Sequence, residues 1–411
     1  MISRWIRAVG LLALAPAAAF AFETVDELAY PSQGAFPAWP EEPRRPWTLF
    51  AYGGLMHDSN VFRRDTDEIS DVIARVGIGA TGSTRIVGRQ ALRAEGAVEY
   101  YDYQDQSQLD HTAYRLLGHY VWQIGNQLDG AAGYERERRI ADLGEFQIES
   151  REMITEERLF VDGGYRFAAR WRLFGLAEQR RTKRQTDDFS ALDENTVRAR
   201  ITHLSGLGNE LGVEARYTRG EAPTDETIPG TTDLVNNDFD EHEVSAVVAY
   251  ALTGQVRAGG RIGHTERKYK QISGRDFSDT TYRGSVTWAT TPKFILSFEA
   301  FHLPESIIEI NSSHVIRTGT AFGARWAATY KLVFSLRLLN EERESQGEAA
   351  DVVLGTPVRD ETLRTWRLGV GWEPQRGWQL GAAFDVGERS SNELGRDYDY
   401  TAFTLNLRWT Y

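Results

Sequence analysis

Arginine and glutamate alternate with apolar residues along much of this 411-residue sequence, and they are the side chains best suited to chemistry. In QALRAEGAVEYY, residues 90–101, the odd positions include Arg93, Glu95 and Glu99, and the even positions from Leu92 to Tyr100 are apolar or small. A guanidinium offers a planar fork that binds carboxylates through two hydrogen bonds. The pattern therefore points either to recognition of anions or to Arg–Glu pairs that stiffen a wall.

Three local motifs resemble enzyme, metal or cofactor sites, and each lacks the context it would need. Gly77–Gly82 matches G-x-G-x-x-G, but an alternating segment follows where a dinucleotide site requires a helix. Asp240–Glu243 has no second ligand pair at zinc spacing, although calcium held loosely by acidic loops stays open. Ser205, near His203, has no nucleophile-elbow pattern around it. We expect no enzyme activity, no cofactor and no nucleic-acid partner.

The N-terminus has the pattern of an export signal. Two arginines precede an apolar stretch from Leu11 to Phe20, and Ala19–Ala21 fits a small-x-small cleavage site. We expect a signal peptide over residues 1–21, because the apolar core is short for an uncleaved anchor. The proline-rich residues 22–46 suit an extended periplasmic tail. The chain has no Cys, which excludes disulfides and lipoprotein attachment.

From Trp47 to Tyr411 one pattern repeats: about ten residues alternate apolar and polar, and a turn follows. Charged residues directly between hydrophobes indicate strands whose two faces meet different environments. We count roughly 18 such segments, which begin near Trp47, Asp71, Gln90, Thr112, Gln127, Glu157, Trp171, Thr196, Asn209, His242, Gln255, Thr280, Lys293, Arg317, Thr329, Thr362, Gly377 and Tyr398.

The connections alternate between short turns and long polar loops, as in membrane barrels with periplasmic turns and external loops. Backbone groups inside lipid must all be paired, so spanning strands have to close into a ring. Residues 47–411 are therefore expected to form an all-β fold, a transmembrane antiparallel up-and-down β-barrel of the Gram-negative outer membrane. Aromatic residues flank the short turns like an interfacial girdle. A soluble β-sandwich would need neither the charged opposite face nor the export signal.

The chain ends on TAFTLNLRWTY, in which every second residue is apolar. Phe403, Trp409 and Tyr411 share the expected lipid face, and the stretch resembles the terminal signature by which the barrel-assembly machinery recognises bacterial barrels. We expect this last strand to pair with the strand near Trp47 and close the ring.

Because successive side chains of a strand point to opposite faces, the charged positions that alternate with apolar ones are assigned to the lumen. The candidate pore-lining residues are Arg75, Arg93, Arg115, Arg172, Arg216, Arg257, Arg261, Arg325, Arg337, Arg367, Arg408, Glu95 and Glu99. The net charge of the chain is −12, and the acids concentrate in the expected loops Gly220–Glu241 and Glu341–Glu361. An electropositive wall would attract an anionic solute. Structural Arg–Glu ladders would produce the same pattern, and the sequence leaves both explanations open.

The stretch HDSNVFR, residues 57–63, follows the first expected strand. Its Asp58, Ser59, Asn60, Phe62 and Arg63 resemble a D-S-N-[VL]-[FY]-R motif of the outer-membrane barrel family encoded in exopolysaccharide operons of exosortase-bearing proteobacteria. The resemblance implies an export conduit for secreted polysaccharide. From the residues alone, the Asp and Asn could make an Asx turn at the strand end.

The leading expectation is a channel that exports an exopolysaccharide, which could be anionic, from periplasm to cell surface. Its partners would be outer-membrane lipids, the secreted polysaccharide, the barrel-assembly machinery and periplasmic components of a polysaccharide export system. Two alternatives remain open. One is a passive general or anion-preferring porin for small solutes. The other is a structural or adhesive surface barrel that acts through acidic external loops.

Overall fold

The structure, a computed structural model, describes residues 47–146, 149–185, 191–205, 209–222, 226–227, 234–271, 273–305, 314–346 and 359–411. The expected signal peptide, residues 1–21, and the expected periplasmic tail, residues 22–46, lie outside the described residues.

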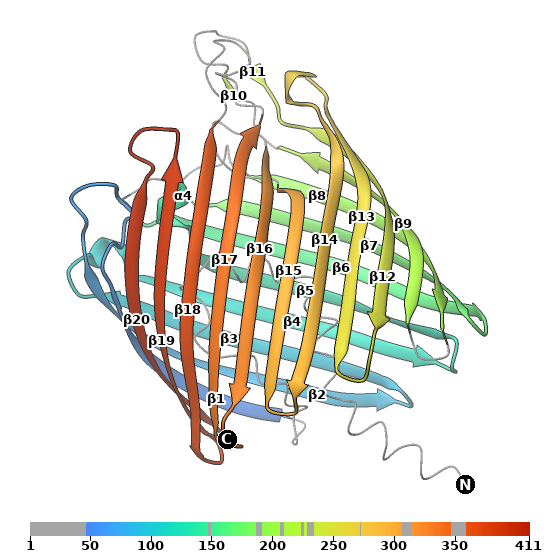
Figure 1. The fold of residues 1–411 in the computed structure, drawn as a ribbon, viewed down its shortest axis with the longest axis horizontal. Coiled ribbons are helices and arrows are strands. Elements are labelled where there is room, and N and C mark those ends of the chain that lie inside the picture. The colour runs from blue at the N-terminus through green and yellow to red at the C-terminus, as the bar shows by residue number, and fades with distance from the viewer. Residues whose placement is uncertain are drawn as a thin grey trace.

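The described chain forms one 18-stranded antiparallel sheet that closes on itself (Figure 1). Its strands are β1 (Trp47–Asp58), β2 (Asp71–Val87), β3 (Gln90–Tyr103), β4 (His111–Ile124), β5 (Leu128–Ile140), β6 (Met153–Ala168), β7 (Trp171–Arg184), β8 (Leu192–Leu204), β9 (Glu210–Glu221), β12 (Phe239–Ala251), β13 (Val256–Tyr269), β14 (Phe277–Thr291), β15 (Phe294–Glu305), β16 (His314–Ala327), β17 (Leu332–Gln346), β18 (Asp360–Gln375), β19 (Trp378–Ser391) and β20 (Tyr398–Thr410). Every strand begins within four residues of its expected start, so the predicted fold class is confirmed.

Small elements lie in the longer connections: η2 (Ser107–Leu109), α4 (Leu143–Phe146), η4 (Ser273–Arg275) and the two-residue strands β10 (Glu226–Thr227) and β11 (Leu234–Val235). No helix in the described ranges is long and apolar enough to cross a membrane.

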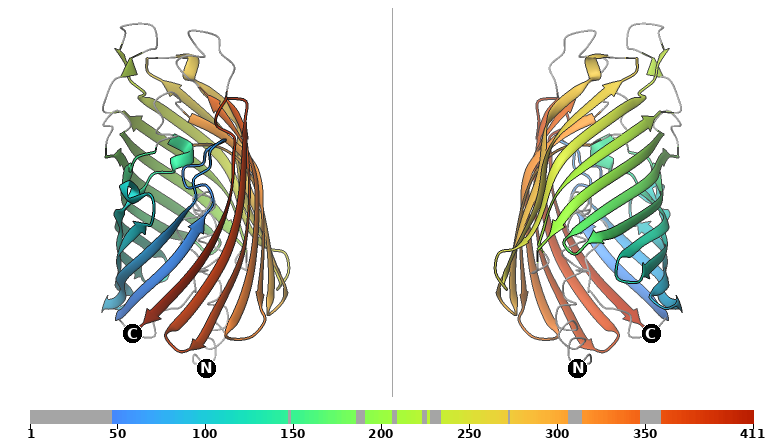
Figure 2. Two further views of the ribbon diagram at one scale, coloured as in Figure 1. Left: turned by 90° about the vertical axis from the view of Figure 1, so that its left-hand side faces the viewer. Right: turned by 90° about the vertical axis from the view of Figure 1, so that its right-hand side faces the viewer.

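The first and last strands meet at the closing seam of the barrel. β1 pairs with β20 in register from Phe50 opposite Thr410 to Asp58 opposite Ala402. Beyond the strand, the backbone N–H of Tyr411 donates to the carbonyl oxygen of Leu49 at 2.8 Å. Figure 2 shows β1 and β20 side by side and all strands strongly tilted, as barrel closure requires. The predicted pairing of the C-terminal strand with the strand near Trp47 is confirmed.

Alternation gives every strand two different faces. Val76 and Ile78 of β2 are 60% and 62% exposed, although both are aliphatic, whereas Ile73 on the opposite face is 3% exposed. Aromatic side chains exposed beside the short turns include Phe167, Trp171, Tyr250, Trp288, Trp326, Trp372 and Tyr411. An outward apolar band bordered by aromatic rings is the surface that a bilayer covers.

Three of the long connections pack together against the inner wall of β2 to β4. Val61 and Phe62 between β1 and β2, Leu109 of η2 and Leu143 of α4 are all buried in one cluster. On the wall, this cluster contacts Ile73, Tyr101, Tyr103 and Ala113. Figure 2 shows α4 and the β1–β2 connection near the end of the barrel that carries the long loops. The apolar residues of these connections therefore draw them over the lumen instead of out into water.

Candidate functional site

The inner wall of the barrel is the surface that carries charged side chains. The thirteen pore-lining residues expected from the sequence all lie on the strand face opposite the exposed apolar side chains. They are the eleven arginines from Arg75 to Arg408 named above, together with Glu95 and Glu99. Arg75, for example, lies between Ala74 and Val76 of β2, which both point the other way. The structure therefore places these residues on the channel wall, while their contact with a transported solute stays a proposal.

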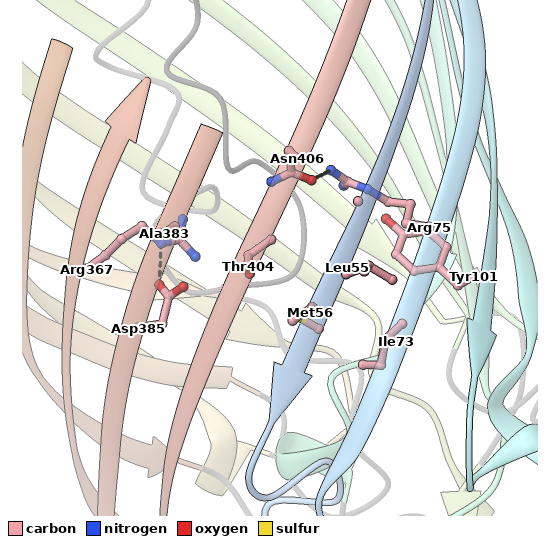
Figure 3. Close-up of a pocket in the computed structure, with 11 residues that line it drawn as sticks. Leu55, Met56, Ile73, Arg75, Tyr101, Arg367, Ala383, Asp385, Thr404 and Asn406 are labelled. Atoms are coloured by element: carbon pink, nitrogen blue, oxygen red, sulfur yellow. Dashed lines mark hydrogen bonds and ion pairs between the residues drawn. The ribbon is translucent and has the colours of Figure 1, made fainter. Parts of the chain in front are cut away.

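One group of wall residues spans the closing seam and lines a small pocket (Figure 3). The guanidinium of Arg75 donates to Asn406 Oδ1 across the seam at 2.8 Å, and its Nη1 lies 3.7 Å from Glu99 Oε2. On the other side of the same pocket, Arg367 of β18 donates to Asp385 of β19. The arginines here are held by carboxylates or amides on neighbouring strands, so their forks are fixed in place.

A second group connects β9, β12 and β13. Glu241 and Glu243 are 4% and 2% exposed. Arg216 Nη2 lies 2.9 Å from Glu241 Oε1 and 2.6 Å from Glu243 Oε2, so one guanidinium joins both acids. Arg267 donates to Glu241 through Nε at 2.9 Å and Nη2 at 2.6 Å, and Arg261 lies 3.4 Å from Glu243. Removing the charge of the carboxylate or of a buried arginine in such a group leaves an uncompensated buried charge, which destabilises the fold strongly.

This arrangement corrects the end of the expected acidic loop Gly220–Glu241. β12 already begins at Phe239, so alternation sends Glu241 and Glu243 to the lumen and His242 outward. The His242 ring packs against Tyr217, with ring centroids 4.9 Å apart. In the described ranges, no group of three or more acids and histidines is arranged to hold a metal ion.

The second expected acidic loop needs the same correction at both ends. Glu341, fully buried, belongs to β17 and receives hydrogen bonds from Arg317 Nη2 at 2.7 Å and Arg343 Nε at 2.5 Å. Glu361 of β18 accepts a hydrogen bond from Arg389 of β19. The strands extend farther toward the long loops than the hydrophobic pattern reaches, because ion pairs replace apolar contacts there.

Other expected wall residues are open to solvent. Arg93 and Arg257 are exposed, and no carboxylate partner for either occurs among the described residues. The Arg115 side chain is 52% exposed, with Nε 3.9 Å from Glu137 Oε2. Arg408 stacks its guanidinium 4.2 Å from the ring centre of Phe50. The wall therefore combines paired arginines with a few that face water.

The HDSNVFR stretch fastens the β1–β2 connection to the barrel. Asp58 Oδ1 accepts a hydrogen bond from the Asn60 backbone N–H at 2.9 Å, which is the expected Asx turn. Asn60, fully buried, donates from Nδ2 to the carbonyl oxygen of Asp399 at 2.9 Å. Ser59 exchanges two hydrogen bonds with the backbone of Thr401 on β20. Phe62 enters the buried cluster described above.

Arg63 completes this fastening. Its Nη1 and Nη2 each lie 2.8 Å from an oxygen of Asp58, and its guanidinium lies 3.8 Å from the ring centre of Tyr400. Burial opposes the charge, but the Asp58 carboxylate outweighs it and raises the pKa of Arg63. Gly144 packs against Arg63, and its carbonyl oxygen accepts a hydrogen bond from Arg389 Nη1 at 3.2 Å. The β1–β2 and β5–β6 connections are thereby tied to each other and to β19.

Sequence reasoning did not find Glu241, Glu243, Glu361 or Arg389 as functional residues. The signal that could have found the first two was available, because counting alternation back from Val244 puts both on the charged face. No local signal announces the contact between Arg389 and Gly144, since 245 positions separate them.

The fold is similar to that of solved outer-membrane barrels. Pseudomonas aeruginosa OpdK, solved with vanillate, is 7% identical with a TM-score of 0.50, and the match covers 89% of this chain and 99% of that chain. Pseudomonas aeruginosa OccK2 (OpdF), solved in complex with glucuronate, is 10% identical with a TM-score of 0.50, and the match covers 89% of this chain and 98% of that chain. At this identity the likeness shows the fold alone. No protein-family model and no curated protein matches the sequence.

The comparisons support an 18-stranded outer-membrane barrel and give no support to the exosortase-associated exopolysaccharide family. The short motif that carried that resemblance, residues 58–63, makes local turns and contacts with β20 in this structure.

Proposed function

We propose that this protein is a passive porin that favours small anionic solutes, in particular those bearing a carboxylate. The observation that carries the proposal is the placement of arginine directly opposite arginine on the lumen side of adjacent strands. The register pairs are Arg158–Arg180, Arg166–Arg172, Arg198–Arg216, Arg261–Arg283, Arg317–Arg343 and Arg337–Arg367.

Like charges directly opposite each other destabilise a sheet, so these pairs need a compensating anion. Wall acids supply this charge within the barrel. Glu178 Oε2 lies 2.7 Å from Arg158 Nη2, Glu214 lies between Arg198 and Arg200, and Glu299 Oε1 accepts from Arg283 Nε at 2.5 Å. Glu341 accepts hydrogen bonds from both Arg317 and Arg343. The two arginines of each opposed pair still lie on adjacent strands of the lumen wall after this pairing with acids. An anionic solute that passes along these arginines exchanges part of its hydration water for hydrogen bonds from the guanidinium groups of the lumen wall.

Two further observations favour small solutes over a polymer. The connections that bury Val61, Phe62, Leu109 and Leu143 lie over the inner wall and occupy part of the passage. Two solved neighbours of the same fold carry vanillate and glucuronate, which are both small carboxylates. The likeness shows fold only, so these ligands suggest a solute class to test and identify no substrate.

The test uses three sugars of nearly equal size and different charge. Purified protein in liposomes should admit glucuronate faster than glucose and glucose faster than glucosamine in a swelling assay. In a planar bilayer under a KCl gradient, the reversal potential should indicate preference for chloride. A preference for potassium, or equal entry of all three sugars, would reject the anion-selective porin.

The alternatives give different results in the same preparation. An export conduit for polysaccharide would pass oligouronates regardless of chain length, whereas the narrowed porin should exclude them beyond a few sugar units. A structural or adhesive barrel would show no solute-dependent swelling. Passage of long oligouronates would therefore restore the polymer-export hypothesis and overturn this one.

A further inference from the structure

A cluster of cations lies on the outer surface of the barrel, on the side away from the lumen. Arg136 and Arg138 of β5 and Arg181 and Lys183 of β7 occupy strand positions that alternate with the lumen-facing residues. Tyr134, two positions before Arg136 on the same face, is 42% exposed and belongs to the outward aromatic and apolar surface. The cluster therefore begins where that surface ends, toward the long loops.

The strand register brings these cations together. Thr155 of β6 lies opposite Arg138 on one side and opposite Lys183 on the other. Neighbouring strands are about 4.8 Å apart, so the Cα atoms of Arg138 and Lys183 are separated by roughly 10 Å. Two long side chains across that distance can reach one shared ligand. The surface between them is hollowed by about 330 Å³, and Tyr114 closes one side.

The charges in this hollow do not balance. Arg136 Nη1 lies 3.4 Å from Glu157 Oε1, and Arg181 Nε lies 2.8 Å from Asp193 Oδ1, so these two cations are paired. Arg138 donates to the neutral Gln185 Oε1 at 2.9 Å, and Lys183 has no carboxylate partner in the described part of the chain.

We infer that this outer hollow binds the phosphate of an anionic glycolipid in the outer leaflet of the membrane. Arg138 offers a fork, Lys183 a compact charge and Thr155 a hydroxyl, which together suit a phosphate monoester. The position at the border of the apolar surface brings the site level with lipid headgroups, where cations attract anionic lipids. The acyl chains of such a lipid would lie against the aliphatic residues below, which include Leu159, 55% exposed. This site is independent of the proposed porin activity.

The experiment titrates the purified, detergent-solubilised full chain with diphosphoryl lipid A and counts bound lipid by native mass spectrometry. The double variant Arg138→Gln/Lys183→Gln should bind on the order of tenfold more weakly than the unaltered protein. The matched control Arg219→Gln/Lys268→Gln also removes two outward cations. Each of those has a neighbouring acid at 2.8 Å, so the control should leave lipid binding unchanged.

Folding of each variant is checked by its heat-modifiable migration on a gel, and Lys183→Gln alone replaces the double variant if that one does not fold. Lipid A stripped of its phosphates should bind poorly to the unaltered protein. Equal binding of the stripped lipid, equal loss in the control variant, or complete displacement by millimolar inorganic phosphate would overturn the assignment. The last of these would identify the hollow as a site for free phosphate.

Discussion

Replacing Asp58 by Asn should release the β1–β2 connection from the wall and leave the barrel closed. The Asp58 and Arg63 side chains are 5% and 13% exposed and joined by two hydrogen bonds of 2.8 Å. The substitution removes the charge of one partner and leaves a buried guanidinium without its carboxylate. The backbone ladders on either side of the connection do not depend on this pair.

The size of the effect follows from the burial. Removing one partner of a buried ion pair costs about 3–5 kcal/mol. The lower end applies here, since asparagine keeps one acceptor oxygen and Arg63 keeps its contact with Tyr400. A cost of about 3 kcal/mol raises the equilibrium constant for local opening roughly 150-fold. Because the connection can open without the barrel, we expect the cost to appear as local opening and not as global unfolding.

Trypsin reports this opening, because the connection contains consecutive cleavage sites at Arg63 and Arg64. In the closed state the Arg64 backbone N–H donates to Asn60 Oδ1 at 2.9 Å, which holds the chain away from the protease. When reclosing is fast, the cleavage rate follows the opening equilibrium. Cleavage after these residues, followed by mass spectrometry, should therefore accelerate by about two orders of magnitude in Asp58→Asn.

Asp65→Asn is the matched control, since it makes the same chemical change at an exposed position of the same connection. Its cleavage rate should stay close to that of the unaltered protein. If Asp58→Asn and Asp65→Asn were cleaved equally fast, the ion pair with Arg63 would not be what holds the connection.

Three other outcomes are expected. Arg93→Gln combined with Arg257→Gln should lower the chloride-to-potassium permeability ratio about two- to threefold, because it removes two exposed charges from the channel wall in screened water, whereas outward Arg364→Gln should not change it; an unchanged ratio in the double variant would contradict the role of these two side chains. Tyr411→Asp should reduce the heat-modifiable, assembled fraction in the outer membrane, because it places a charge at the seam and in the aromatic girdle; normal assembly would show that the terminal aromatic is dispensable. Glu241→Gln should destabilise the barrel in thermal unfolding by about 3 kcal/mol, because it leaves the buried Arg267 without its carboxylate partner, whereas Arg216 keeps Glu243; an unaltered melting temperature would mean that water reaches Arg267.

Much of the fold could be predicted because the relevant signal is local. Alternation with a period of two fixes which side of each strand faces lipid, and it needs no knowledge of distant residues. The strands that start near Trp47, Asp71 and Gln90 were found for this reason. The same rule put Arg75 and Arg408 on the inner wall and the terminal aromatic residues on the outer one.

Prediction failed where polar residues continue a strand beyond the apolar pattern. Glu241, Glu341 and Glu361 were assigned to acidic loops because their neighbours in sequence are acidic. In the barrel they are ladder residues, since arginines on adjacent strands compensate their charge. Sequence composition shows that acids and arginines are both present but not that they lie side by side.

By itself the sequence determined the strand number and the two faces of each strand, because both depend on short-range periodicity. Only the tertiary structure decided which arginine meets which acid, that Arg63 and Gly144 hold two connections together, and that cations from β5 and β7 share one outer hollow. These contacts depend on register between strands and on loops that fold back across the barrel. Register and loop packing are set by the closed ring as a whole, so no single segment of the chain encodes them.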